Sequence, residues 1–253
     1  MERFAIAMGV VAAATSLSLG GAVTTLDFDT EDDFLTPLLN GQAVSSPTTF
    51  GALVNINAFG VNNLGAAIFD TTPDGPNMGG QDPDLLVGLG NMLILQSPDA
   101  PAQSVAGIFD SPNDALMGGA FVFDFIDPVE MLSVKLVDVD GGNEVLVTMV
   151  DFDGKTRLYS VPAGWSFDLS ADGPNGYDTL DMTTLAAQMG EGGSAATAIE
   201  DDGFDSSRVT TVFFEFSGSG GLDDVSFRVI PTPGGAGLLA LAGGAMLVRR
   251  RRE

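Results

Sequence analysis

The sequence predicts an all-β protein, an antiparallel β-sandwich that lies between two apolar terminal segments. Short runs in the body alternate apolar and polar residues or are rich in β-branched and aromatic residues, as strands are. Turns rich in Gly, Asp and Pro separate these runs. No long segment between the two ends shows the 3.6-residue periodicity of an amphipathic helix, so a helical fold is not expected.

The first segment, residues 1–22, has the organisation of a secretory signal peptide. Arg3 and the free amine supply positive charge, residues 4–19 are apolar or small, and Gly20-Gly21-Ala22 offers a cleavage site of small residues. We expect cleavage after Ala22 and export by the secretion machinery. The alternative is a buried first helix, but acidic residues follow directly and no helical pattern continues.

The body, residues 23–229, has the size of one domain. Between Val23 and Pro233 the chain has five basic and 32 acidic side chains, a net charge of −27, and it contains neither histidine nor cysteine. Without cysteine, no disulfide can brace the exported protein. The charge predicts repulsion of nucleic acid and anionic lipid and attraction of divalent cations.

The strands follow one another along the body with short turns between them. Residues 131–161 predict a meander, because Asp140-Gly141-Gly142 and Asp153-Gly154 are turn signals and the second is typical of a type I′ hairpin. Residues 71–90 and 190–207 are predicted to be long loops, either functional or mobile. The predicted strands are residues 26–29, 53–59, 66–69, 92–95, 120–125, 131–139, 144–152, 157–161, 209–216 and 222–229, with further alternation over 165–169.

The last segment, residues 230–253, has three parts. Residues 230–234 form a rigid spacer, because Pro231 and Pro233 restrict the backbone around Thr232. Residues 234–248 are a run of 15 apolar, uncharged residues that predicts a helix. As a helix it spans roughly 22 Å of the ~30 Å hydrocarbon core, which suits a transient transmembrane helix. The block of four arginines should stay on the cytoplasmic side: Arg249, Arg250, Arg251 and Arg252.

This order of proline motif, short apolar helix and arginine cluster resembles the PEP-CTERM sorting signal, with Pro231-Thr232-Pro233 in place of the common Pro-Glu-Pro. Proteins with this signal are processed by exosortases, and many belong to exopolysaccharide or biofilm systems. The resemblance implies an exosortase-type partner, transient attachment to the inner membrane, and a final place at the cell surface or outside the cell. An ordinary C-terminal anchor is the alternative. A sortase signal does not fit, because Leu-Pro-x-Thr-Gly is absent.

A second resemblance concerns Gly221-Leu222-Asp223-Asp224-Val225-Ser226-Phe227. This run is similar to the last strand of galactose-binding-like jelly rolls and of several carbohydrate-binding modules. In those families an acid of the last strand commonly joins groups near the first strand around a structural calcium ion. The resemblance therefore implies a jelly-roll-like sandwich and a Ca²⁺ site formed by Asp27, Asp29, Glu31, Asp223 and Asp224.

The strand pattern supports this site independently. Asp223 should share a face with Val225 and Phe227, which point into the core, and a buried acid is costly unless it is paired or bound to a metal. Calcium prefers several oxygen ligands. In the alternative, Asp223 lies near water at the start of the strand and needs no metal.

Other acidic pairs are weaker candidates. Asp82-Pro83-Asp84, in the first long loop, is a possible further cation contact. Asp138-Val139-Asp140 and Asp151-Phe152-Asp153-Gly154 do not fit an EF-hand, because the glutamate at the twelfth position is missing, and we interpret them as acids of hairpin turns.

Enzyme signatures are absent from the sequence. Without His or Cys there can be no Ser-His-Asp triad and no cysteine nucleophile, and no nucleotide-binding motif occurs. Two carboxylates could hydrolyse a glycoside, but among so many acids a pair arises by chance. We therefore expect a non-catalytic surface or matrix protein. The alternative is a carbohydrate-binding module that retains polysaccharide, with Trp165 as its candidate ligand-binding residue unless that side chain packs in the core.

Overall fold

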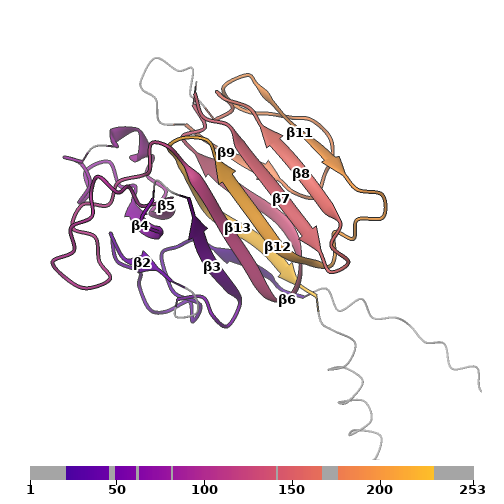
Figure 1. Ribbon diagram of the computed structural model, residues 1–253, viewed down its shortest axis with the longest axis horizontal. Coiled ribbons are helices and arrows are strands. Elements are labelled where there is room, and N and C mark those ends of the chain that lie inside the picture. Colours follow the sequence, from indigo (N-terminus) through magenta and orange to yellow (C-terminus); the bar gives the residue numbers. More distant parts are fainter. Residues whose placement is uncertain are drawn as a thin grey trace, which may run out of the picture.

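The computed structural model describes residues 21–45, 49–60, 63–80, 82–140, 142–166 and 176–230. Over these residues the chain is all-β, and its strands join in one continuous antiparallel sheet (Figure 1). Within the described ranges the only helical element is the 3₁₀ turn η1 (Pro83–Leu85). The strands are β1 (Val23–Leu26), β2 (Ala43–Val44), β3 (Val54–Phe59), β4 (Ala66–Asp70), β5 (Asn91–Leu95), β6 (Gly119–Val137), β7 (Val145–Asp151), β8 (Thr156–Val161), β9 (Tyr177–Asp181), β10 (Gln188–Met189), β11 (Ala195–Glu200), β12 (Val209–Phe216) and β13 (Gly221–Val229).

Strand β6 connects the two parts of the sheet. Up to Phe125 it pairs with β3 and β12. From Val129 onward it pairs with β13 and β9, and Val129 also faces Val209 of β12. Ile126 and Asp127 are exposed at the transition, and Pro128 has no N–H to donate to a ladder. The two separate strands predicted at 120–125 and 131–139 are therefore one bent strand, because pairing resumes beyond the proline.

The two parts of the sheet contain different strands. The first has the order β3-β6-β12-β7-β8-β11-β10, and Figure 1 shows β12, β7, β8 and β11 side by side. The second has the order β9-β6-β13, with β1 and β5 sharing the other edge of β13 and β4 and β2 following β5. Strand β11 lies inside the stretch predicted as a loop at 190–207, because its pairing with β8 is a long-range contact that its own sequence does not signal.

The hairpin between β7 and β8 differs from the predicted type I′ turn. A type I′ turn needs positive φ at both central residues. Only Gly154 has one, at 78°, whereas Asp153 does not. The N–H of Gly154 donates to the Asp151 carbonyl at 3.0 Å, and the N–H of Asp151 donates to the Lys155 carbonyl at 2.9 Å. The connection is thus a type I turn closed by a glycine in the left-handed region.

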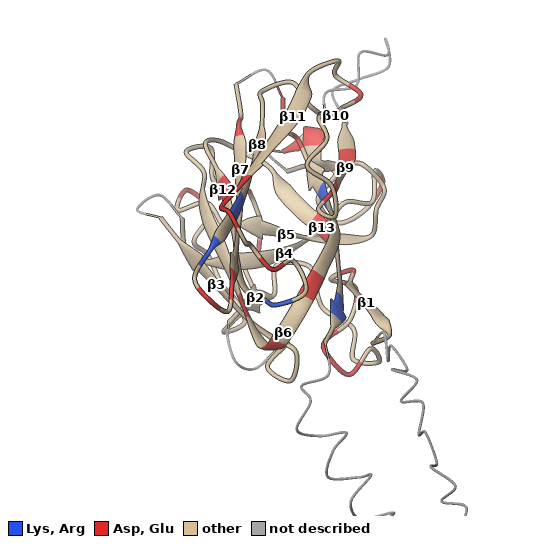
Figure 2. Ribbon diagram, turned by 90° about the vertical axis from the view of Figure 1, so that its right-hand side faces the viewer, with Lys and Arg blue, Asp and Glu red and all other residues tan. Residues whose placement is uncertain are grey.

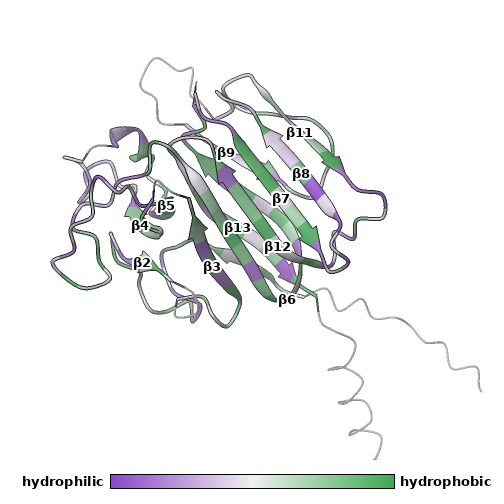
Figure 3. Cartoon of the chain, viewed as in Figure 1, coloured by the Kyte–Doolittle hydropathy of each residue, from purple (hydrophilic) through white to green (hydrophobic). Residues whose placement is uncertain are grey.

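Aromatic side chains of β6, β12 and β13 form the centre of the core. Edge-to-face ring pairs link Phe121 to Phe216 at 5.9 Å, Phe123 to Phe214 at 5.2 Å and Phe125 to Phe227 at 4.9 Å between centroids. Burial of each such side chain contributes about 1.5–3 kcal/mol. Figure 3 shows apolar residues concentrated along the central strands, with hydrophilic residues more frequent at strand ends and in loops.

The two ends of the described body lie side by side. Strand β1 pairs with β13, so that Val23 faces Arg228. Gly21 packs so closely on the Val229 carbonyl that a Cβ at this position would overlap its oxygen. Most of the predicted signal peptide, residues 1–20, and the tail, residues 231–253, lie outside the described residues. Within the described part of the chain, no helix is long and apolar enough to cross a membrane.

Hydrogen bonds fix both ends of the loop that follows β4. The Thr71 hydroxyl donates to the Gly90 carbonyl at 2.8 Å and accepts from the Leu89 N–H at 2.7 Å. Farther along, the Asn77 amide donates to the Asp70 carbonyl at 2.9 Å. These bonds hold the loop against β4 and β5, and with it the turn η1 and its acidic residues.

Candidate cation sites

The carboxyl of Asp223 is buried in the second part of the sheet. Asp223 is 2 % exposed, and Val225 and Phe227 are both 0 % exposed, so the predicted inward face is confirmed. Its Oδ1 atom has no hydrogen-bond partner among the described residues. Burial, followed by the negative charge of Asp224, raises the pKa of Asp223 to about 8. The alternative position near water at the strand's start is therefore wrong.

The end of β1 brings one further carboxylate close to Asp223. Asp29 accepts a hydrogen bond from the Asn91 N–H at 2.9 Å, and its negative charge contributes to the raised pKa of Asp223. Asp29 also packs on Gly90, where an added Cβ would lie 2.9 and 3.0 Å from its two carboxylate oxygens. The first strand, the start of β5 and the last strand thus meet at this point.

The other three predicted ligands are engaged differently. The Asp27 carboxylate accepts the Asp29 N–H at 3.0 Å and so forms a local turn. The Asp224 carboxylate pairs with the Lys135 ammonium at 2.5 Å, and its backbone has a positive φ of 46° within an irregular part of β13. Glu31 lies in the turn after β1, where its N–H donates to the Thr36 carbonyl. The structure therefore couples Asp29 to Asp223 and turns Asp224 toward a cation of the protein itself.

A second group of acids lies at the end of β6 near η1. We call it the aspartate cluster, and it consists of Asp82, Asp84, Asp114 and Asp138. Asp114 is 4 % exposed and Asp138 is 3 % exposed, whereas Asp82 and Asp84 are half-buried. The sequence singles out Asp82 and Asp84 as a possible cation contact and treats Asp138 as an acid of a hairpin turn. It does not indicate Asp114.

Hydrogen bonds fix the two buried acids of the aspartate cluster. One carboxylate oxygen of Asp114 accepts the Gly220 N–H, and the N–H of Asp114 donates to Asp82 at 2.9 Å. The Oδ2 atom of Asp138 accepts from the Ser219 hydroxyl at 3.0 Å. The turn between β12 and β13, residues 217–220, therefore supports both acids from one side.

The acids of this cluster raise one another's pKa. Burial and the charges of Asp82 and Asp138 raise the pKa of Asp114 to about 8. Burial and the charges of Asp84 and Asp140 raise the pKa of Asp138 to about 7. The pKa of Asp82 is raised to about 6, mainly by burial. Among the described His, Cys, Asp and Glu side chains, no group of three or more is arranged to hold a metal ion.

The basic residues of the body are all engaged elsewhere. Acidic groups are spread over the strands and loops in Figure 2, and positive ones are few. Four of the five basic side chains pair with a carboxylate, and the Lys155 ammonium donates to the Asp202 carbonyl. The four carboxylate pairs are Lys135 with Asp224, Arg157 with Glu200, Arg208 with Asp153, and Arg228 with Glu130.

The expectation that Trp165 binds a ligand is corrected by its burial. Trp165 is 1 % exposed, and its indole N–H donates to the Gln188 carbonyl at 3.1 Å. Gly190 lies against the Trp165 backbone and ring, so the side chain is enclosed on that face as well. The indole packs in the core and is not available to stack on a sugar.

Comparison with known proteins gives no family for this chain. No model of a known protein family matches the chain, and a comparison with curated proteins finds no match either.

Proposed function

We propose that the protein is an exported, non-catalytic component of the cell surface or extracellular matrix, with a structural or interaction role in an exopolysaccharide or biofilm system. The observation that carries this proposal is the segment 230–253, with its Pro-Thr-Pro motif, apolar run and four arginines. An exosortase-type enzyme would process this segment after the C-terminal helix has held the chain in the inner membrane. The signal-peptide pattern of residues 1–22 supports the same route.

The position of the two ends is compatible with this route. Because Gly21 contacts Val229, both apolar segments would leave the body at the same edge. Both could then lie in one membrane before processing, with the body on one side of it. Cleavage after Ala22 would leave Val23, the first residue of β1, at the new N-terminus. The pairing of β1 with β13 does not involve the segment that is removed.

We infer that the bent sheet is a jelly-roll-like sandwich whose two layers are the parts on either side of the β6 bend. The ring pair between Phe125, in the first part, and Phe227, in the second, supports this packing. A sandwich with a strongly acidic composition suits a matrix protein. Its net charge would keep it soluble and allow divalent cations to bridge it to other acidic polymers.

A structural role is favoured over a carbohydrate-binding module by the state of the aromatic side chains. Sugar-binding platforms need several exposed aromatics on one face, and Trp165 is buried. The Phe152 ring lies 4.4 Å from the Arg208 guanidinium carbon, and the Tyr177 ring lies 5.5 Å from the Lys135 ammonium, so both already hold cations. Among the described residues, the exposed aromatic ones belong to separate loops and strand ends: Phe34, Phe59, Phe152 and Tyr177.

We also propose that a structural calcium ion joins Asp29 to Asp223. The unpartnered Oδ1 atom of Asp223 and the nearby Asp29 carboxylate are the donors that support this site. Calcium accepts six to eight oxygens in flexible geometry, so carbonyls and water would complete its shell. The ion would add to the strand pairing that already joins β1 to β13.

Export and processing are tested by mass spectrometry of the mature protein from its native host. We expect an N-terminus near Val23 and loss of the arginine block. Replacing Arg249–Arg252 with Glu should disturb the orientation and sorting of the tail. Recovery of the intact chain as a soluble cytoplasmic protein, or unchanged surface display of the Glu variant, would contradict the proposal.

The Asp29–Asp223 ion is tested by thermal unfolding of the full-length protein in a mild non-ionic detergent. Free calcium at 100 times Kd stabilises the folded state by ~2.7 kcal/mol. For a domain near 200 residues this raises Tm by roughly 5–11 °C. Sodium chloride at matched ionic strength should do much less, and Asp223→Asn should remove its share of the calcium-specific increase. An equal calcium response in wild type and Asp223→Asn would exclude this ion.

A further inference from the structure

The aspartate cluster lies where four segments distant in the sequence meet. Asp82 and Asp84 belong to the loop that contains η1, Asp114 lies in the loop between β5 and β6, and Asp138 comes directly after β6. The fourth segment is the turn 217–220 before β13, which bonds Asp114 and Asp138. Gly221 pairs with both Ile94 and Val137, which draws the ends of β5 and β6 and the turn before β13 to one end of the sheet. The sheet topology therefore brings the four carboxylates together.

The Asp138 side chain has a free acceptor inside the cluster. Asp138 is 3 % exposed, its Oδ2 atom accepts from Ser219, and its Oδ1 atom has no hydrogen-bond partner among the described residues. Its backbone has a positive φ of 59°, which is costly for a residue with a Cβ. The Asn143 amide donates to the carbonyl of the same residue at 3.4 Å and to the Ser219 hydroxyl at 3.0 Å. Several contacts thus hold Asp138 in a strained conformation that leaves one buried oxygen without a donor.

The described part of the chain supplies no positive charge to this cluster. No Lys or Arg is among the groups that shift the pKa values of Asp82, Asp114 and Asp138. The five basic side chains of the body contact other groups, as described above. Buried carboxylates without a cationic partner must either keep protons or bind a metal ion.

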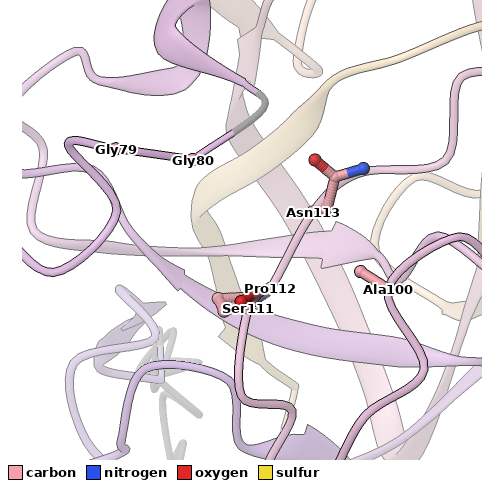
Figure 4. A pocket seen from close by; sticks show the side chains of 6 residues that line it. All are labelled: Gly79, Gly80, Ala100, Ser111, Pro112 and Asn113. Atoms are coloured by element: carbon pink, nitrogen blue, oxygen red, sulfur yellow. The ribbon is translucent and has the colours of Figure 1, made fainter.

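A small cavity lies beside the cluster and shares Asn113 with its surroundings. Its volume is about 140 Å³, and Figure 4 shows the six residues around it. With its amide turned so that the NH₂ group faces Asp82, Asn113 donates to both carboxylate oxygens at 2.6 and 3.2 Å. Asn113 therefore lines the cavity and also contacts Asp82 of the cluster. The lining residues are Gly79, Gly80, Ala100, Ser111, Pro112 and Asn113.

We propose that the aspartate cluster binds one divalent cation, with Ca²⁺ as the ion that its all-oxygen donors fit best, and that this ion joins the η1 loop to the end of β6. Asp114 and Asp138 are fixed by Gly220 and Ser219 and provide the rigid half of the site. Asp82, whose carboxylate accepts the N–H of Asp114, and the half-buried Asp84 would provide the other half. Calcium tolerates irregular geometry and takes carboxylate, carbonyl and water oxygens at 2.3–2.6 Å, whereas Mg²⁺ demands a near-ideal octahedron.

This ion is independent of the Asp29–Asp223 ion and of the export route. The test is a calcium titration by calorimetry on the full-length protein in non-ionic detergent, first treated with chelator. The variants are Asp138→Asn and Asp223→Asn, and Asp127→Asn is the matched control, because Asp127 is exposed on the β6 bend. If both ions bind, the wild type takes up two, and each of the first two variants loses a different one.

The decisive comparison is between wild type and Asp138→Asn. We expect the variant to lose one bound calcium ion or to bind it at least tenfold more weakly, with Asp127→Asn unchanged. If Asp138→Asn does not fold, Asp84→Asn in the half-buried loop serves instead, and the same loss is expected. Because metal ligands must be deprotonated, calcium binding at pH 7 should also release protons, measured as a dependence of the heat on the buffer.

Two outcomes would overturn the proposal. One is an equal number of bound calcium ions, with equal affinity, in wild type, Asp138→Asn and Asp84→Asn. The other is neutralisation of the cluster by protons alone. In that case acidification raises Tm, calcium does not bind, and its addition releases no protons. Loss of the Asp223-dependent ion with retention of the Asp138-dependent one would contradict only the Asp29–Asp223 ion.

Discussion

Replacement of Asp223 by Asn should remove part of the pH dependence of stability. Burial and the charge of Asp224 raise the pKa of Asp223 in the folded protein to about 8, from an ordinary value of 3.8. Between roughly pH 4 and pH 8 the folded state therefore holds a proton that the unfolded chain has lost. The stabilising contribution is complete below about pH 4 and is lost as the pH rises toward and through the folded-state pKa.

The size of the effect follows from the shift in pKa. One pKa unit corresponds to 1.36 kcal/mol, so the Asp223 contribution to the free energy of unfolding falls by about 2 kcal/mol between pH 6 and pH 8. In a domain near 200 residues this lowers Tm by about 4–8 °C. Asp33, Asp151 and Asp201 have lowered pKa values, and their contribution is lost only below about pH 4, outside this range.

The assay is calorimetric unfolding of full-length wild type and Asp223→Asn in non-ionic detergent with chelator, at several pH values from 6 to 8. Asn replaces the neutral carboxyl, so the Tm of the variant should fall less steeply with pH than that of the wild type. The exposed control Asp127→Asn should keep the wild-type slope. Parallel curves for wild type and Asp223→Asn would refute the argument, because the carboxyl would then titrate alike in the folded and unfolded states.

Two further substitutions, each with a control, test the close approach of Gly90 to Asp29 and the buried ion pair of Arg157. Gly90→Ala should destabilise the protein by about 1–3 kcal/mol in urea unfolding, because φ is +90° there and the new Cβ would meet a carboxylate. Gly142→Ala, which meets nothing within 4 Å, should change little, and equal effects would contradict the steric argument. Arg157→Met should cost about 2–5 kcal/mol, because Arg157 is only 7 % exposed and its guanidinium bonds Glu200 through two nitrogens. Arg208→Ala breaks an exposed pair and should cost under about 1 kcal/mol, and a similar loss in both variants would show that burial is not decisive.

The strands with a clear local pattern could be predicted, because the apolar and polar residues within each one indicate which side chains are buried. The runs at 53–59, 66–69, 92–95, 209–216 and 222–229 correspond to β3, β4, β5, β12 and β13. Strands β9 and β11 were missed, because their short, polar or small-residue sequences become strands only by pairing with β6 and β8. The continuity of β6 across Pro128 was missed for a related reason, since local sequence shows the interruption and only the partners on both sides show that pairing resumes.

Composition and alternation by themselves determined the all-β class, the net charge of the body and the inward face of Asp223. The two terminal signals also rest on sequence alone, and they stay predictions because almost all of those residues lie outside the described ranges. The tertiary structure decided which acids meet: it placed Asp29 by Asp223, gave Asp224 to Lys135, and gathered Asp82, Asp84, Asp114 and Asp138. The physical reason is that the pKa of a carboxyl and its affinity for cations depend on the charges and solvent around it in space, and segments far apart in the chain supply both.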